Sequence, residues 1–281
     1  MQQSPSKPFK GNPVAVVLDA SDLTTEQMQT VANWTNLSET TFVLPATNAQ
    51  ADYRVRIFTP NHELPFAGHP TIGTAYALLE SNLIQPKDGK LLQECDAGLI
   101  SLYVQEMHDG LSISFELPKP VVTPLDLVQI DHIERILGCP IDRKLVPALV
   151  DVGARWIVVH TSDAKTVLAT KPDFAELAIH DAEMKITGIC IYGAWSEDLI
   201  EVRSFAPACG VNEDPVCGSG NGSVAAFIRY HNVDSLTSSR LLKSSQGKAL
   251  GREGSINLTI SEESILVGGS AITCIEGKIN L

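Results

Sequence analysis

The sequence predicts an α+β protein built from two related halves, because one strand–turn–helix pattern occurs twice in it. The segment Tyr53-Arg-Val-Arg-Ile-Phe-Thr-Pro60 matches Ile200-Glu-Val-Arg-Ser-Phe-Ala-Pro207. A few residues further on, Pro65-Phe-Ala-Gly-His69 matches Pro215-Val-Cys-Gly-Ser219, with three extra residues in the second turn. An alanine-containing helical stretch follows each match. The length of 281 residues fits one large domain or two of medium size.

The composition is that of a soluble globular protein, with 44% hydrophobic and 19% charged residues. The net charge of −12 and the pI near 5.0 argue against nucleic acid or an anionic membrane as a partner. A small acidic substrate would therefore need a local positive site, such as the N-terminus of a helix.

Cysteine usage and the absence of targeting signals predict a cytoplasmic protein. No CxxC pair or dense disulfide framework occurs, which favours a reducing compartment with free thiols. No apolar run approaches membrane-spanning length, and the first residues lack a signal-peptide core. The six cysteines are Cys95, Cys139, Cys190, Cys209, Cys217 and Cys274.

The first half is placed at residues 1–118 and is expected to be completed by a C-terminal strand at about 270–281. A turn at Gly11 enters a buried strand that ends at Leu18, and apolar spacing predicts a helix over 24–34 with Thr24 or Thr25 as N-cap. Strands are predicted at 41–44 and 53–58, followed by a long turn over 59–70 and a helix over 71–83 that Pro70 can begin. Short strands follow at 99–105 and 111–117.

The second half is placed at residues 125–269, after a proline-dense linker over 118–124. A short helix over 130–137 should end at Gly138. Strands are predicted at 153–159 and 186–192, with a helix over 173–178 between them. The strand over 200–207 then leads into the glycine-rich turn Glu213-Asp-Pro-Val-Cys-Gly-Ser-Gly-Asn-Gly222 and a helix over 223–228. Two such helix starts facing each other would form an anion-binding cleft between the halves.

Several segments resemble the phenazine-biosynthesis PhzF family, within the diaminopimelate epimerase-like fold. They are Gly11-Asn-Pro-Val-Ala-Val16, Asn36-Leu-Ser-Glu-Thr-Thr-Phe42, Pro65-Phe-Ala-Gly-His-Pro-Thr71 and Glu213-Asp-Pro-Val-Cys-Gly-Ser219, with Gln246-Gly247 and Gly251-Arg252 as a further segment. The resemblance implies two pseudo-symmetric halves, each a curled β-sheet around a central helix. It also implies cofactor-free proton chemistry on a small carboxylic acid, and frequent homodimers.

The resemblance assigns proton transfer to Glu39, with His69, Asp214 and Ser219 assisting. Burial in an apolar cleft would raise the pKa of the Glu39 carboxyl, as general acid–base work near neutral pH requires, although an exposed loop carboxylate is the alternative. His69 could instead cap its turn, and Asp214 before Pro215 could be only a turn former. Ser219 is expected to bind substrate, or to serve only as an N-cap.

The backbone N–H groups of Gly68 and Gly218 are expected to bind a substrate carboxylate. Related epimerases and proline racemases use two facing cysteines as acid and base. The corresponding positions here are Ala67 and Cys217, so only one thiol is present and a two-thiol racemase is disfavoured. Cys217 is predicted to line the substrate site, either as a small residue in a tight turn or as a nucleophile. No spacing indicates a metal site.

The isomerase hypothesis leads, and two alternatives remain open. One is a racemase or epimerase that uses Cys217 as a base; the other is a non-catalytic metabolite-binding or interaction protein that kept the fold. One segment departs from the family pattern. A strand is expected before Pro8-Phe-Lys-Gly-Asn-Pro13, and this chain offers only Met1 to Lys7 there, whereas the second repeat has Val146 to Val152.

Overall fold

The computed structural model describes residues 7–108, 110–231 and 240–280, and the chain divides into two compact units. The first unit comprises Met1–Glu116 and Gly268–Leu281, and the second comprises Leu117–Val267. From the sequence, the halves were expected at 1–118 and 125–269, with 118–124 as a linker. In the structure this segment contains strand β8 (Val121–Pro124), which pairs with the next strand of the second unit. Pro124, the last residue of β8, is tolerated because β8 is an edge strand.

The first unit contains one mixed sheet of strand order β1-β2-β3-β5-β6-β7, with β4 paired to β3. The β1–β2 and β3–β5 pairs are parallel, and the other pairs are antiparallel. The elements of this unit are β1 (Val14–Val17), α1 (Thr25–Thr35), β2 (Glu39–Leu44), β3 (Tyr53–Phe58), β4 (Glu63–Leu64), α2 (Gly68–Glu80), β5 (Lys90–Cys95), β6 (Gly98–Met107) and β7 (Gly110–Glu116).

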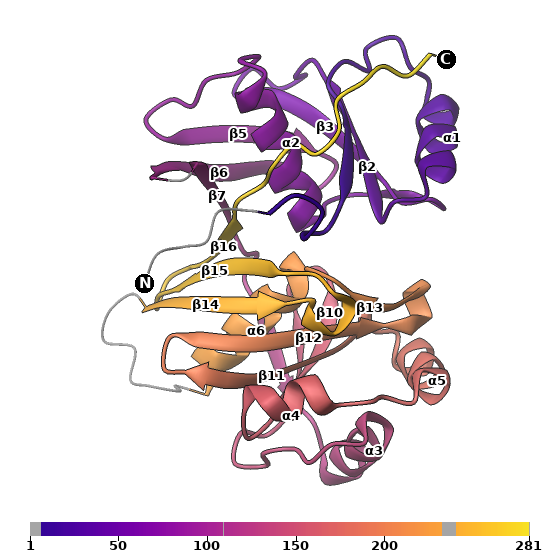
Figure 1. Ribbon diagram of the computed structural model, residues 1–281, viewed down its shortest axis with the longest axis vertical. Helices are drawn as coiled ribbons and strands as arrows, with labels where there is room; N and C mark the ends of the chain where they lie inside the picture. The colour runs from indigo at the N-terminus through magenta and orange to yellow at the C-terminus, as the bar shows by residue number, and fades with distance from the viewer. Residues whose placement is uncertain (1–6, 109, 232–239, 281) are drawn as a thin grey trace. The chain divides into compact units, whose positions relative to one another are not determined.

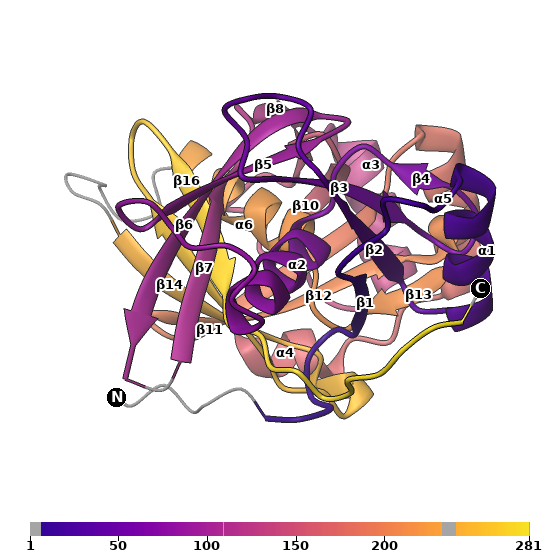
Figure 2. The same ribbon diagram turned by 90° about the horizontal axis from the view of Figure 1, so that it is seen from above.

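Helix α2 is the central helix of the first unit. It contacts both β1 and β7, which stand at opposite ends of the strand order, so the sheet must curl around it. Figure 2 shows α2 between these two strands. The helix begins at Gly68, three residues before the predicted start at residue 71. Pro70 fits inside the first turn because the N–H that proline lacks would have no partner within the helix.

The second unit repeats this arrangement with two extra strands at one end. Its strand order is β16-β15-β14-β12-β11-β10-β9-β8, with β13 paired to β12, and β10–β11 and β12–β14 are the parallel pairs. Its remaining elements are α3 (Leu127–Leu137), β9 (Ala148–Asp151), β10 (Arg155–His160), α4 (Ala164–Ala169), α5 (Phe174–Met184), β11 (Gly188–Ser196), β12 (Leu199–Ala206), η1 (Pro207–Cys209), β13 (Val211–Asp214), α6 (Gly218–Tyr230), β14 (Arg240–Gln246), η2 (Lys248–Leu250), β15 (Gly254–Ile260) and β16 (Ile265–Gly269).

Helix α6 occupies the central place in the second unit. It contacts β8, β9, β10 and β11 from one end of the strand order and β15 near the other end. Figure 1 shows α6 together with β10, β11 and β15. The predicted α+β class, with two pseudo-symmetric halves that each curl around a helix, is confirmed.

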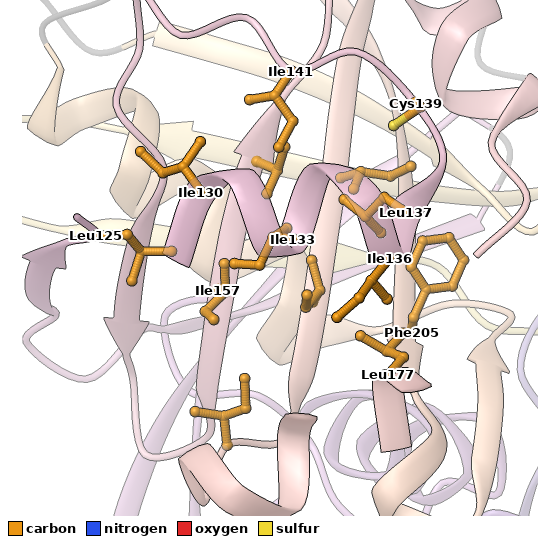
Figure 3. Close-up of a cluster of buried hydrophobic side chains, with 14 of the residues drawn as sticks. Leu125, Ile130, Ile133, Ile136, Leu137, Cys139, Ile141, Ile157, Leu177 and Phe205 are labelled. Carbon is orange, nitrogen blue, oxygen red and sulfur yellow. The ribbon is translucent and has the colours of Figure 1, made fainter. Parts of the chain in front are cut away.

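One apolar cluster of the second unit lies between α3, α5 and the outer face of the sheet (Figure 3). Ile133 and Ile136 on α3 pack with Ile157 and Phe205 on the strands, and all four side chains are almost fully buried. Burial of each such side chain contributes about 1.5–3 kcal/mol to folding. Helix α3 begins three residues before its predicted start because the side chain of Asp126 caps it, and it ends at Gly138 as predicted.

The C-terminal strand expected at about 270–281 is not formed over residues 270–280, which have no strand assignment. Most of these side chains are exposed, including Ile275 at 85%, so no face of the segment is buried to fix a strand register. Its Thr273 hydroxyl instead donates a hydrogen bond to Glu80 at the end of α2. The strand expected before Pro8 falls mainly on residues 1–6, outside the described residues. None of the described helices is long and apolar enough to cross a membrane.

Candidate active site

The first unit brings Glu39 and His69 together. Glu39 is the first residue of β2, and His69 is the second residue of α2. Oε2 of Glu39 lies 3.3 Å from Nε2 of His69, and each side chain is only 16% exposed. The two atoms are close enough for proton exchange, although their alignment does not satisfy hydrogen-bond geometry. Such contacts are often loose before substrate is bound.

Burial controls the protonation state of His69. It lowers the pKa of the imidazole to about 4. A hydrogen bond to the backbone of Pro13 raises this pKa, but by less than burial lowers it. Because proline has no N–H, the Pro13 carbonyl accepts this bond from the ring. Nε2 faces Glu39, so the hydrogen-bond network assigns the ring proton to Nδ1. Nε2 then presents a lone pair to the carboxyl, an arrangement suited to sharing one proton between the two residues.

The start of α2 can also bind an anion. The N-cap residue Ala67 has no side-chain hydrogen bond to the helix, and the first turn contains no acidic residue. The first N–H groups of a helix, including that of Gly68, have no carbonyl partner within the helix, and they lie at the positive end of its dipole. A substrate carboxylate or developing oxyanion beside Gly68 would therefore be stabilised.

The second unit brings Asp214, Cys217, Gly218 and Ser219 together around the start of α6. Oδ1 of Asp214 accepts a hydrogen bond of 2.9 Å from the Val216 N–H. Burial raises the pKa of the Asp214 carboxyl to about 6, although this N–H and the Cys217 thiol, which also donates to the carboxylate, lower it. Asp214 can therefore accept or release a proton near neutral pH.

Cys217 is the N-cap of α6, and its sulfur accepts a hydrogen bond of 3.3 Å from the Gly220 N–H. Burial raises the pKa of this thiol well above its ordinary value, and the charge of Asp214 raises it further. The thiol therefore stays protonated at neutral pH, which disfavours the nucleophile or base role. Its structural equivalent is Ala67, because both residues cap helices of 13 residues at the same place in the repeat.

Ser219 occupies the position in α6 that His69 occupies in α2. Its Oγ accepts a hydrogen bond of 3.1 Å from Nε1 of Trp156 and lies 3.6 Å from Sγ of Cys217. Trp156 comes from β10 and is 2% exposed. Trp156 was not predicted to be part of the site, because its contact with Ser219 joins residues 63 positions apart and depends on the strand register.

Gln246 at the end of β14 fixes the turn before α6. Its Nε2 donates a hydrogen bond of 2.8 Å to the Asp214 carbonyl. Its Oε1 accepts from the Cys217 N–H at 3.1 Å and from Nδ2 of Asn221 at 2.7 Å. From the sequence, Gln246 was only part of a family-like segment and no role was predicted for it. The signal available in the sequence was an amide side chain directly before Gly247.

The two units differ at the position of Glu39. In the antiparallel pairs, Thr40 opposes Phe58 and Ile189 opposes Phe205, so Gly188 is the equivalent of Glu39. A Cβ on Gly188 would lie 1.9 Å from the carbonyl oxygen of Phe205. No side chain can occupy that position in the second unit. In the part of the chain that the structure describes, no three His, Cys, Asp or Glu residues are grouped as metal ligands.

Two curled sheets, each around a central helix, define the class of epimerase-like folds. The solved hydroxyproline epimerase of Agrobacterium vitis shares this architecture, with a TM-score of 0.58 at 16% identity over 90% of this chain and 80% of that one. The structure of the PhzF-family phenazine biosynthesis protein of Bacillus anthracis is more similar, with a TM-score of 0.82 and 27% identity over 94% and 92% of the two chains.

The family model of phenazine biosynthesis-like proteins, PhzC-PhzF, matches residues 5–277, and the chain therefore belongs to this family. It is 42% identical to the "Antisense-enhancing sequence 1" protein of Schizosaccharomyces pombe, over 97% of this chain and 95% of that protein. It is 36% identical to the trans-2,3-dihydro-3-hydroxyanthranilate isomerase of Pseudomonas chlororaphis, over 80% and 77% of the two chains. The comparisons thus support the isomerase class.

Proposed function

We propose that the protein is an isomerase that moves a proton on a small carboxylic acid without a cofactor. Glu39 is the general acid and base of this reaction, and His69 is its proton-sharing partner. The observation that carries the proposal is the 3.3 Å approach of Oε2 of Glu39 to Nε2 of His69 in a largely buried setting. Membership in a family whose curated relatives include named isomerases supports it.

The reaction proceeds in two proton transfers. The Glu39 carboxylate takes a proton from a carbon activated by a neighbouring carbonyl, carboxyl or double bond, and the electron pair delocalises into the substrate. The N–H groups at the start of α2 stabilise the negative charge that develops. Glu39 then returns the proton to a different carbon, so the substrate and product are isomers and no electrons leave the system. The lone pair on Nε2 of His69 can hold the proton between the two steps.

The substrate class follows from the charges. The chain carries a net charge of −12, so an anionic substrate must be bound by local positive potential rather than by the overall field. A helix start such as that at Gly68 or that at Gly218 can supply this potential within its own unit. The P. chlororaphis relative is named for a cyclic amino acid that carries a carboxylate, and a substrate of similar chemistry is the first to test.

The racemase alternative has less support. A two-base racemase needs a second thiol where this chain has Ala67, and the Cys217 thiol is buried, protonated and engaged with Asp214. The non-catalytic alternative makes a different prediction. A ligand from a metabolite extract should raise the melting temperature while no product appears.

The test is proton exchange with solvent. Wild type and Glu39→Gln are incubated in heavy water with trans-2,3-dihydro-3-hydroxyanthranilate and a panel of related acids, and deuterium incorporation is followed by mass spectrometry. We expect incorporation by wild type and a loss of about 10²- to 10⁴-fold in the variant. Glu63→Gln is the matched control, because this carboxylate lies in the same unit but is engaged by Arg56. Equal incorporation by wild type and Glu39→Gln would remove Glu39 from the mechanism.

A further inference from the structure

The indole of Trp156 has no counterpart in the first unit. Val14 opposes Glu39 across the β1–β2 pair, and Trp156 opposes Gly188 across the β10–β11 pair, so Trp156 is the equivalent of Val14. In the first unit the acid Glu39 approaches His69. In the second unit the acid position is empty, and the neighbouring Trp156 donates a hydrogen bond to Ser219, the equivalent of His69.

The contacts of Ser219 determine which way its hydroxyl proton points. A serine hydroxyl has one proton and two lone pairs, and the N–H of Trp156 uses one lone pair at 3.1 Å. The neighbouring sulfur of Cys217, at 3.6 Å, accepts from Gly220, while the thiol proton donates to Asp214. Because the single proton of the Cys217 thiol is given to Asp214, the Ser219 hydroxyl must be the donor in its contact with the Cys217 sulfur. The Ser219 proton is therefore held by a weak sulfur acceptor or is offered to a ligand.

We infer that Trp156 is a positioning residue that keeps Ser219 a hydrogen-bond donor. As a donor, Ser219 selects an oxygen acceptor of the substrate, which is a carboxylate or carbonyl oxygen, over an amine. The inference rests on the proposed function, since it defines which substrate group Ser219 binds. The rigid indole lies almost wholly in the core, at 2% exposure, and gives Oγ a fixed donor. An oxygen acceptor on the substrate is a stronger partner for the hydroxyl than the Cys217 sulfur, so binding exchanges a weak hydrogen bond for a strong one.

The hydrogen bond itself can be tested by NMR, without any substrate. The chain contains three tryptophans, Trp34, Trp156 and Trp195, so ¹⁵N-labelled indole groups give three resonances. Trp156→Phe identifies its own signal. We expect Ser219→Ala to shift that signal and to speed its exchange with solvent, while leaving the Trp195 indole, which donates to Glu201, unchanged. A Trp156 resonance that does not respond to Ser219→Ala overturns the inference.

A binding cycle tests the consequence for the ligand. Dissociation constants of anthranilate, and of 2-aminobenzylamine as the matched amine, are measured by calorimetry for wild type, Trp156→Phe, Ser219→Ala and the double variant. We expect Trp156→Phe to weaken anthranilate binding by about 5- to 10-fold. The double variant should bind no more weakly than Ser219→Ala alone. Binding of the amine should not change between wild type and the variants.

Trp195→Phe is the matched control, because its indole bonds to Glu201 and not to Ser219. If Trp156→Phe weakens anthranilate binding as much in the Ser219→Ala background as in wild type, Trp156 acts through packing alone and the inference is wrong. If wild type binds no carboxylic acid from the panel, the proposed function fails. The NMR response of Trp156 to Ser219→Ala then decides the positioning role by itself.

Discussion

At the scale of single residues, one physical cause acts on two candidate groups with opposite results. Burial disfavours the charged form of any group, so it lowers the pKa of His69 to about 4 and raises that of Asp214 to about 6. The imidazole is thereby kept neutral, with a lone pair facing Glu39, while Asp214 titrates close to neutral pH. Groups whose pKa values are shifted in this way are frequent at sites of proton transfer.

The two shifts predict opposite dependences of stability on pH. In the unfolded chain His69 binds a proton below its ordinary pKa of 6.5, whereas in the folded protein it does so only near pH 4. Its contribution to the free energy of unfolding is therefore fully present above pH 6.5 and is lost as the pH falls towards 4. In the folded protein Asp214 keeps its proton up to about pH 6, whereas its ordinary pKa is 3.8. Its contribution to the free energy of unfolding is therefore present below pH 3.8 and is lost as the pH rises through 6. Each full shift corresponds to roughly 3 kcal/mol.

Single substitutions should separate the two effects. In His69→Gln the free energy of unfolding should fall, relative to wild type, as the pH rises from 4 to 6. In Asp214→Asn it should rise, relative to wild type, over the same window. Urea unfolding at half-unit pH steps measures both differences, and groups common to all three proteins cancel in them. Variant curves that run parallel to wild type would show that neither group titrates differently on folding.

At the scale of elements, each helix start is held by the same ionic contact. Arg56 on β3 forms a two-pronged pair with Glu63 on β4, and Arg203 on β12 forms one with Glu213 on β13. Each short acidic strand leads directly into the turn before α2 or α6. The first pair is partly exposed, at 19% and 33%, whereas the second is buried, at 8% and 5%. NH1 of Arg203 also donates to the backbone carbonyls of Thr170 and Val167.

The difference in burial predicts very different costs for the same chemical change. Glu213→Gln leaves the guanidinium of Arg203 buried without its counter-ion, so it should destabilise the second unit by about 3–5 kcal/mol. Glu63→Gln is the matched control and should cost about 0–1 kcal/mol, because water can solvate Arg56. Thermal unfolding followed by tryptophan fluorescence measures the first effect, because two of the three tryptophans, Trp156 and Trp195, lie in the second unit. Similar losses of stability in the two variants would contradict this account.

At the scale of the whole molecule, the internal repeat made the fold predictable. Matching Arg56 with Arg203 and Ala67 with Cys217 led to two related halves, and the structure repeats the strand pairing in both. The roles of Trp156 and Gln246 could not be predicted in this way. Their contacts connect residues far apart in the chain, and they depend on strand register and on how far each side chain is buried.

The C-terminal segment shows a second limit of sequence patterns. A C-terminal strand was expected at about 270–281, but a strand needs both a partner edge and a buried face. Residues 270–280 have exposed side chains instead, and a side-chain bond to Glu80 connects them to the first unit. Composition alone does not say whether either condition is met.

The division of the chain leads to a last prediction about independent folding. The second unit is one continuous segment, Leu117–Val267, whereas the first unit needs both Met1–Glu116 and the returning segment from Gly268. The core around α3, the buried Arg203–Glu213 pair and the Trp156–Ser219 bond all have both partners inside the second unit. A fragment of residues 117–270, which includes all of β16, should therefore fold alone, with a cooperative thermal transition and a native-like Trp156 indole resonance.

The complementary fragment, residues 1–116, should be much less stable. It lacks Gly268, which packs closely on Ser114, and Thr273, which bonds to Glu80. Adding a peptide of residues 268–281 should restore part of its stability, because binding to the folded state alone shifts the equilibrium towards it. Circular dichroism of the two fragments, with and without the peptide, measures this difference. An unfolded 117–270 fragment beside a stable 1–116 fragment would contradict this prediction and show that the second unit depends on the first. The core of the second unit would then be too small to offset the conformational entropy lost on folding.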